Sequence, residues 1–143
     1  MKCYTYIEET EEEKVLIYAK ERTKLIDDIE SLVISSDIDL TGTYNEEIVK
    51  INVNGVVCFI SENNKVFALI NDKKYQIRQR LYQIEEMNLN AFIKLNQSCL
   101  ANKNKIKKFE STIGGALKVI FKNGYIDYIS RRELKNVKQR MGI

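Results

Sequence analysis

The feature that most limits how this chain can fold is a series of turn-forming residue pairs that divides its second part into short apolar runs. Asn63-Asn64, Asp72-Lys73 and Asn123-Gly124 each separate two runs rich in Val, Ile, Phe and Tyr, a pattern typical of β-hairpins. Asn54-Gly55 is another hairpin dipeptide, and Gly114-Gly115 lies between two apolar runs as a turn would. Because no helix joins most of these runs, the sequence predicts antiparallel, meandering sheets rather than a doubly wound parallel sheet.

Short helices are expected among these strands. Leu81, Ile84 and Met87 recur at helical spacing after the strand-type stretch KYQIR. Near the C-terminus, Ser130 and Glu133 form the pattern of a capping box, which predicts a helix beginning at residue 131. The apolar face of this second helix consists of Leu134, Val137 and Met141.

Arg131 and Arg132 occupy the first turn of that C-terminal helix, where the helix dipole is already positive. An exposed cation at this end costs about 0.3 to 1 kcal/mol. Either water screens the two charges, or the arginines bind an anion that is not part of the chain.

The first 45 residues or so have a different pattern. Residues 2–8 and 14–19 are strand-like with a run of glutamates between them, and residues 21–35 have apolar side chains at helical spacing. We therefore expect an acidic β-β-α extension over residues 1–45 and a second domain over 46–143. The polar stretch DIDLTGTYNEE connects them and has room for a short strand.

The charge of the chain is divided along its length. Residues 1–50 carry 6 basic and 13 acidic side chains, whereas residues 51–143 carry 17 basic and 7 acidic ones. This division favours a binding surface for an anionic partner in the second part. Two differently charged solvated faces are the alternative, and charge alone does not separate nucleic acid from an anionic membrane or an acidic protein.

The composition excludes several kinds of catalytic and metal site. The chain has no histidine, which removes Ser-His-Asp and Cys-His catalysis and histidine-containing zinc sites. Its three cysteines, Cys3, Cys58 and Cys99, have no metal-ligand spacing, and their odd number argues against a disulfide framework. No apolar run approaches the roughly 20 residues of a spanning helix, and no signal-peptide pattern opens the chain. We expect a cytoplasmic protein that is not an enzyme and uses no metal, cofactor or small-molecule substrate.

The stretch FIKLNQSCLANKNKIKKF combines strand-type residues with an unusually dense polar set. Phe92, Ile93 and Leu95 indicate a strand, and Leu100 and Ile106 return to the core. Amide side chains suit the edge of adenine, lysine suits phosphate or guanine, and serine suits either, so the set fits DNA. An ordinary polar loop is the alternative. The polar residues are Lys94, Asn96, Gln97, Ser98, Asn102, Lys103, Asn104 and Lys105.

From about residue 50 to the C-terminus, the sequence resembles the LytTR family of bacterial DNA-binding domains. The similarity runs in order through VVCFISENNKVFALI, YQIRQRLYQIEE, FIKLNQSCLAN and KNGYIDYISRRELKNVK. The most specific parts are the pattern F-x-[RK]-x-x-x-S-x-x-x-N, met by Phe92, Lys94, Ser98 and Asn102, and the closing S-[RV]-R at residues 130–132.

The resemblance implies a mainly β (α+β) fold of elongated antiparallel sheets with short helices, which lies along double-stranded DNA and reads major grooves with loops. It implies base contacts from Gln97 and Arg132, and an anion at the helix start that is DNA phosphate or a guanine edge. Phosphate contact or loop shaping is expected of Lys94, Ser98, Asn102 and Lys135. The full set of candidate DNA-binding residues is Lys65, Lys94, Asn96, Gln97, Ser98, Asn102, Lys103, Arg131, Arg132 and Lys135.

These features favour a sequence-specific transcriptional regulator, and three departures from the family pattern leave its target sequence open. Gln97 stands where arginine or lysine is frequent, Asn96 where histidine or serine is frequent, and Ile60 where glutamate is frequent. The first two favour the alternative of a protein-interaction module that has kept the fold and lost DNA binding. The many lysines and arginines argue against that alternative. RNA binding is less favoured, because the aromatic residues mostly occupy core strand positions.

The N-terminal segment is too short for the receiver domain that many family members carry, and it lacks parallel βα repeats. We expect a stand-alone member in which this segment pairs two copies into a homodimer that reads two half-sites. Covering the DNA-binding domain and binding a regulator are its alternative roles. A membrane protein that restrains the regulator is a partner implied by the family resemblance.

Overall fold

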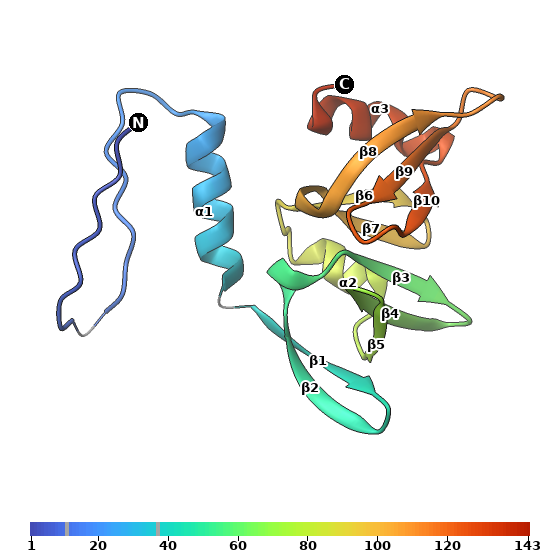
Figure 1. Ribbon diagram of the computed structural model, residues 1–143, viewed down its shortest axis with the longest axis horizontal. Helices are drawn as coiled ribbons and strands as arrows, with labels where there is room; N and C mark the ends of the chain where they lie inside the picture. Colours follow the sequence, from blue (N-terminus) through green and yellow to red (C-terminus); the bar gives the residue numbers. More distant parts are fainter. Residues whose placement is uncertain (11, 37) are drawn as a thin grey trace.

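The computed structural model describes residues 1–10, 12–36 and 38–143, and its strands form two antiparallel sheets that lie side by side (Figure 1). Helix α1 (Lys24–Ser36) lies beside the sheets, and the residues before it run as extended chain away from them (Figure 1). The expected class, antiparallel sheets with short helices, is confirmed.

The larger sheet has seven strands in the order β2-β1-β5-β4-β3-β7-β6, and the smaller has three in the order β10-β9-β8. The strands of the larger sheet are β1 (Asp39–Tyr44), β2 (Glu47–Asn52), β3 (Cys58–Glu62), β4 (Lys65–Ile70), β5 (Lys73–Ile77), β6 (Phe92–Asn96) and β7 (Cys99–Asn102). The smaller sheet consists of β8 (Ile106–Ser111), β9 (Leu117–Phe121) and β10 (Ile126–Tyr128). The remaining elements are α2 (Leu81–Glu86), α3 (Arg131–Met141) and the 3-10 turns η1 (Val53–Gly55) and η2 (Lys103–Lys105).

The turn-forming pairs explain most of this topology. Asn63 and Asn64 adopt positive φ angles of 50° and 62°, which closes the β3–β4 hairpin as expected. Asn123-Gly124 closes β9–β10, with Gly124 at a φ of 90°. The turn between β4 and β5 lies one residue earlier than predicted, at Asn71-Asp72.

The hairpin predicted at Asn54-Gly55 is wrong. These residues belong to η1, where the side chain of Asn52 accepts a hydrogen bond from the Asn54 backbone N–H at 2.9 Å. Strand β2 pairs with β1, and β3 pairs with β4 and β7, so the two strands on either side of the dipeptide are not neighbours. The Asn52 side chain thus offers the Asn54 N–H a local partner, which favours this turn over a hairpin.

Two apolar clusters form the core. The first lies between the larger sheet and α2, where the rings of Phe59 and Phe92 stand 5.1 Å apart and Ile84 is buried. The second lies beneath the smaller sheet and α3, and contains Phe121, Val119 and Val137. The predicted apolar face of the last helix is confirmed, since Leu134 and Met141 pack against this second cluster.

The expected extension is present only in part. Helix α1 confirms the predicted helix, but the described residues of 2–8 and 14–19 form no strand. Their side chains cover no apolar layer, as the exposed fractions of Tyr6 (84%) and Ile7 (94%) show. Residues with high strand propensity do not form a sheet without a partner strand. The boundary expected after residue 45 stays a prediction, although β1 lies before it and pairs with both β2 and β5.

None of the helices in the described ranges is both long enough and apolar enough to cross a membrane. The described side chains also contain no group of acidic residues and cysteines that could hold a metal ion.

Candidate nucleic-acid interface

The turn Gln97-Ser98, between β6 and β7, lies between the β3–β4 hairpin and the start of α3 (Figure 1). The Ser61 N–H on β3 donates to the Ser98 carbonyl at 2.9 Å. The Ser130 N–H, just before α3, donates to the Leu95 carbonyl on β6 at 2.9 Å. Backbone hydrogen bonds thus join three of the segments expected to contact DNA into one continuous part of the surface.

Asn96 fixes this turn from within. Its amide nitrogen donates to the Asp127 carboxylate at 2.9 Å and to the Tyr128 carbonyl at 2.8 Å. Its amide oxygen accepts from the Ser98 backbone N–H at 2.8 Å. With both ends of the amide engaged and the residue half-buried, Asn96 shapes the turn, and its edge is not free to read a base.

Gln97 and Ser98 form the tip of the turn, and both are exposed. Among the described residues, neither side chain has a hydrogen-bond partner within the protein, so both remain available to a ligand. The bulge between Lys94 and Asn96 interrupts the β6–β7 ladder directly before the tip. Bulges of this kind redirect side chains at the end of a hairpin.

Asn102 is buried, whereas a phosphate contact requires an exposed side chain. It is 1% exposed and donates to the Val56 carbonyl at 2.9 Å, while its oxygen accepts from the Asn104 backbone N–H at 3.0 Å. A phosphate contact from this buried side chain is therefore a wrong expectation, since it would take the Asn102 amide away from the buried Val56 carbonyl and from the Asn104 N–H. The loop-shaping role that was its alternative agrees with these bonds.

The candidate lysines differ in whether an acidic partner is present. Lys94 lies 3.5 Å from Glu85 on α2, and Lys103 lies 3.5 Å from Asp28 on α1. Lys65 is exposed at the β3–β4 turn, with no carboxylate within ion-pair distance in the described ranges. An uncompensated cation is the one that gains most from an added anion.

The start of α3 presents Arg131, Arg132 and Lys135 to solvent, and none of them forms an ion pair with a described residue. Ser130 is the N-cap as predicted, with φ −68° and ψ 155°, but its side chain makes no capping hydrogen bond. The predicted capping box is therefore wrong. The serine is held through its backbone N–H, which donates to Leu95, and the first turn of the helix keeps donors for an external anion.

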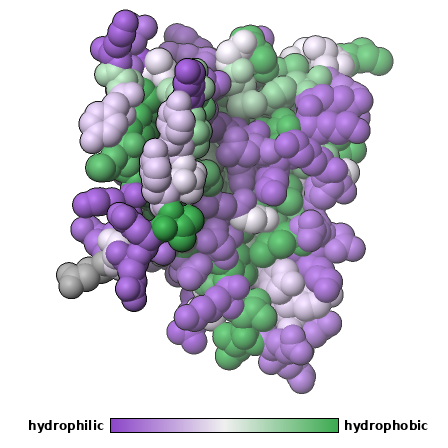
Figure 2. Space-filling view, turned by 60° about the vertical axis from the view of Figure 1, so that its left-hand side comes forward, coloured by the Kyte–Doolittle hydropathy of each residue, from purple (hydrophilic) through white to green (hydrophobic). Residues whose placement is uncertain are grey.

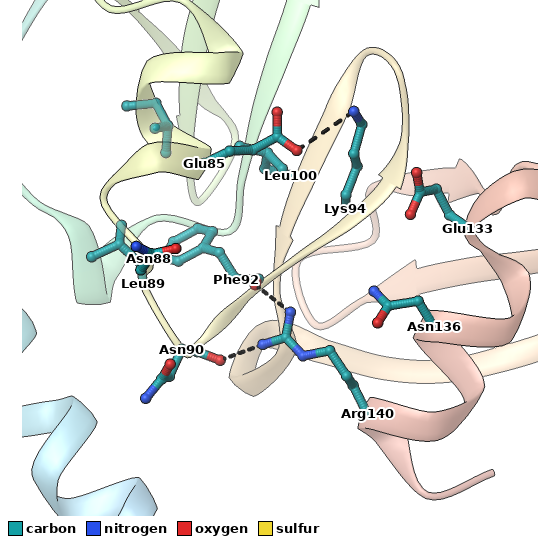
Figure 3. Close-up of a pocket in the computed structure, with 11 residues that line it drawn as sticks. Glu85, Asn88, Leu89, Asn90, Phe92, Lys94, Leu100, Glu133, Asn136 and Arg140 are labelled. Carbon is teal, nitrogen blue, oxygen red and sulfur yellow. Dashed lines mark hydrogen bonds and ion pairs between the residues drawn. The ribbon is translucent and has the colours of Figure 1, made fainter.

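Arg140 fastens the other end of α3 to β6 (Figure 3). Its guanidinium donates to the Phe92 carbonyl at 3.0 Å and to the Asn90 carbonyl at 2.8 Å. Burial lowers the pKa of Arg140 from its ordinary value. These bonds border a cavity of about 550 Å³ between α2, β6 and α3, whose walls include Lys94 and Glu133 (Figure 3). The helix is thus clamped at both ends, which fixes where its arginines lie.

Comparison with known proteins agrees with this geometry. The profile of the family described as "LytTr DNA-binding domain" matches residues 46–142. The chain belongs to the LytTR family. A solved LytTr DNA-binding domain, from a Bacillus cereus protein titled a methyl-accepting/DNA response regulator, has the same fold, with a TM-score of 0.68. It shares 15% sequence identity with this chain, and the match covers 73% of this chain and 97% of that one.

Relatives from Staphylococcus aureus match a longer part of the chain. Proteins of the strains NCTC 8325 / PS 47 and COL, each named an uncharacterized HTH-type transcriptional regulator, are 32% identical over 125 residues. Each match covers 84% of this chain and 85% of the relative. The match is longer than the LytTR profile, so it reaches into the residues before 46.

In this LytTR protein, the described helices do not form a helix-turn-helix unit. Strands β1 to β5 lie between α1 and α2, and strands β6 to β10 lie between α2 and α3. A helix-turn-helix motif needs two successive helices joined by a short turn. The exposed groups that could enter a groove are instead those of the β6–β7 turn, the β3–β4 turn and the first turn of α3.

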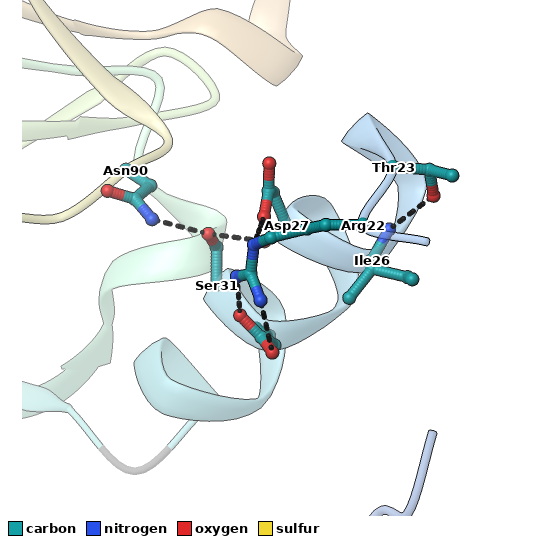
Figure 4. A network of polar contacts seen from close by, with 7 residues as sticks. Arg22, Thr23, Ile26, Asp27, Ser31 and Asn90 are labelled. Carbon is teal, nitrogen blue, oxygen red and sulfur yellow. Dashed lines mark hydrogen bonds and ion pairs between the residues drawn. The ribbon is translucent and has the colours of Figure 1, made fainter. Parts of the chain in front are cut away.

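Helix α1 contacts the LytTR domain at the residues before β6 (Figure 4) and at η2. Asn90 donates to the Ser31 hydroxyl at 2.9 Å, and Arg22 pairs with Asp27 and Glu30 within the N-terminal segment. The ion pair of Asp28 with Lys103 belongs to the same contact. An acidic helix therefore already occupies the surroundings of one candidate DNA-binding lysine.

Two arginines near the candidate interface are not among the DNA-binding residues predicted from the sequence. Arg78 and Arg80 follow β5 and are exposed beside the β3–β4 turn, where Arg80 donates to the Asn64 carbonyl at 2.7 Å. The signal in the sequence was the alternating RQR directly after the strand-type stretch KYQI. Its meaning depends on Asn64, 16 residues earlier, being folded against it.

Proposed function

We propose that this protein is a sequence-specific, double-stranded DNA-binding transcriptional regulator that reads major grooves with the β6–β7 turn and the start of α3. The observation that carries the proposal is one continuous surface on which Gln97, Arg131 and Arg132 are all exposed and lack partners among the described residues. Membership of the LytTR DNA-binding family and the names of the Staphylococcus relatives, which call them transcriptional regulators, support it. A protein acting on bacterial DNA would work in the cytoplasm.

The two arginines at the helix start then have a physical role. Arg132 donates to a guanine edge, and Arg131 and the first backbone N–H groups of α3 bind a neighbouring phosphate. DNA supplies the anion that offsets the unfavourable position of these cations in the helix dipole.

Gln97 is the second base-reading residue. Its amide offers a donor and an acceptor in one plane, which matches the N6 and N7 atoms of adenine. Lys65, Ser98 and Lys135 contact the backbone around it. Lys94 and Lys103 join only by exchanging their carboxylate partners, Glu85 and Asp28, for phosphate.

The test begins with selection of bound fragments from bacterial genomic DNA, followed by fluorescence anisotropy across a salt series. A scrambled duplex of equal length is the reference. We expect sequence-dependent binding and a steep negative salt slope, because several phosphates are neutralised. Gln97→Ala and Arg132→Ala should each remove about 1–3 kcal/mol of discrimination at one base position, whereas Lys135→Ala should weaken both duplexes alike.

Equal, weak binding to every duplex after the selection would reject this function. It would favour the alternative of a protein-interaction module that retains the fold. The neutral Gln97 is the observation on that side, since a module without DNA needs no cation at the tip. Asn96 no longer bears on the choice, because its amide is engaged within the protein.

The regulator is expected to act as a homodimer joined through its N-terminal segment. Apolar side chains of that segment lie largely in water, and Figure 2 shows them gathered with polar ones on the face that α1 and the preceding residues present. They leave on the order of 1,000 Å² of apolar surface exposed, comparable with the roughly 800 Å² that each partner buries in a standard interface. The main contributors are Tyr4, Tyr6, Ile7, Leu16, Tyr18, Leu25, Leu32 and Ile34.

Sedimentation velocity of the full chain tests this arrangement. We expect a dimer at tens of micromolar, and a monomer when Leu16→Lys and Tyr18→Lys are combined. Ile113→Lys is the control, because Ile113 is even more exposed than Leu16 and Tyr18 but lies on the β8–β9 turn. A monomeric wild-type chain would remove the dimer and leave DNA binding by single copies intact. The membrane-protein partner implied by the family stays a prediction.

A further inference from the structure

We infer that the groove between the β3–β4 turn and the residues after β5 is a binding site for a DNA phosphodiester, held by Arg78 and Arg80. The inference rests on the proposed function and adds a contact region that lies outside the segments expected from the sequence. The charge of the groove, the anchoring of Arg80 and the position of the groove near Gln97 support it.

The groove has a volume of about 410 Å³, and its charged lining residues are all cations: Lys65, Arg78 and Arg80. The polar side chains of Thr43, Asn64 and Gln76 also line it, and no carboxylate does. Three positive charges around one concave, polar space repel one another unless an anion enters. A phosphodiester supplies that charge and has oxygens for the arginine donors.

Among the described residues, the cations of this groove have no acidic partners, unlike some lysines close by. Lys74, the second residue of β5, lies 3.0 Å from Glu62, and Lys118 on the other sheet lies 3.3 Å from Glu110. In contrast, Lys65, Arg78 and Arg80 form no ion pair with any described residue. These three cations thus face one groove without a described carboxylate to compensate them.

Arg80 is positioned before any ligand arrives. Its backbone N–H donates to the Gln83 side chain at 2.8 Å, and its guanidinium donates to the Asn64 carbonyl at 2.7 Å. Guanidinium has five N–H donors, so one bond to Asn64 leaves most of them for a phosphate. Fixing the side chain in advance lowers the entropy that binding has to overcome.

The groove adjoins the proposed reading surface. Arg80 also lines the neighbouring hollow, together with Ser61, Lys94 and Gln97. A phosphate held at Arg78 and Arg80 would thus lie beside the β3–β4 turn, next to the hollow that Gln97 borders. Duplex DNA carries a charge along every step of its backbone, so a strand that passes Gln97 can present a phosphate there.

Anisotropy salt titrations of the full-length protein test this site. Arg78→Gln should lower affinity several-fold at about 0.15 M salt, equally for the selected and the scrambled duplex. It should reduce the slope of log K against log salt by about 0.9, the value for one phosphate. Arg78→Gln combined with Arg80→Gln should lower affinity further but add little to this loss of slope, since both arginines hold the same phosphate. Arg80→Lys keeps the charge and should keep most of the slope.

Lys50→Gln is the matched control, since it removes one exposed cation from β2 of the same sheet and outside the groove. If the wild type binds with a steep slope and Arg78→Gln has the slope of the wild type and of Lys50→Gln, the site is wrong and the proposed function stands. If the wild type binds no selected fragment, both are overturned. If Arg78→Gln changed the base preference, Arg78 would contact a base and the proposed phosphate site would be wrong.

Discussion

The amide of Asn96 lies 2.9 Å from the carboxylate of Asp127, and this bond ties the β6–β7 turn to strand β10. We predict that Asn96→Ala lowers affinity for the selected duplex several-fold, because the turn loses three hydrogen bonds that order it, each worth about 0.5–1.5 kcal/mol. The salt slope should stay unchanged, because no charge is removed. Anisotropy titrations measure both quantities.

Gln97→Ala is the comparison variant, because it removes the neighbouring side chain without touching the bond to Asp127. It should relax the base preference and leave the thermal stability unchanged, whereas Asn96→Ala should lower the stability. Equal effects of the two substitutions on base preference would contradict a purely positioning role of Asn96.

Asn102 provides a second prediction. Asn102→Ala should lower the free energy of unfolding by about 1–3 kcal/mol, because it removes the buried bond to the Val56 carbonyl and the acceptor for the Asn104 N–H. Thermal melts followed by circular dichroism would show a lower midpoint. Asn104→Ala is the control, since Asn104 takes part through its backbone and its side chain is exposed. If Asn104→Ala lowered the melting temperature as much as Asn102→Ala, the stabilisation would not be due to the hydrogen bonds of the Asn102 side chain.

The hairpins at Asn63-Asn64 and Asn123-Gly124 could be predicted because turn chemistry is local. The strands expected at 2–8 and 14–19 failed because sheet formation also needs a partner strand. Likewise, Asn54-Gly55 has the composition of a hairpin turn, but β3 pairs with β4 and β7 and not with the strand before the dipeptide. The local sequence pattern therefore predicts whether a segment is a strand or a turn better than it predicts which strands pair with each other.

The same limit divides the candidate site. Gln97, Arg131 and Arg132 are exposed as a polar tip and a helix start suggest. Asn96 and Asn102 have equally suitable chemistry for DNA, but their partners lie 31 and 46 residues away in the chain. Whether an amide faces a base or a backbone carbonyl depends on such distant contacts.

Arg140 is predicted to position α3 without touching DNA. Arg140→Ala should lower the free energy of unfolding by about 1–3 kcal/mol, because the carbonyls of Asn90 and Phe92 lose their donors. It should also weaken DNA binding through misplacement of the helix start. Arg132→Ala should weaken binding with no loss of stability. Equal melting curves for Arg140→Ala and the wild type would contradict the clamp.

Glu110 gives the protein an acid-sensitive contribution to stability. Hydrogen bonding to Lys108, followed by that to Lys118 directly across the β8–β9 ladder, lowers the pKa of Glu110. The contribution is therefore complete above the ordinary glutamate pKa of about 4.3 and is lost as pH falls through the lower folded-state value. The melting difference between wild type and Glu110→Gln should shrink between pH 7 and pH 3. Glu47→Gln, an exposed residue without an ion pair to the described residues, should show no such trend.

The three cysteines should differ sharply in reactivity. Cys3 is exposed, whereas Cys58 and Cys99 are buried on neighbouring strands. Contact with the Cys58 thiol, together with burial, raises the pKa of Cys99 well above its ordinary value, so it stays a protonated thiol at pH 8. Ellman's reagent should therefore label one thiol rapidly in the folded protein and three after unfolding. Cys3→Ser should abolish the rapid phase, and a remaining fast thiol in that variant would show that the β3–β7 core opens to solvent.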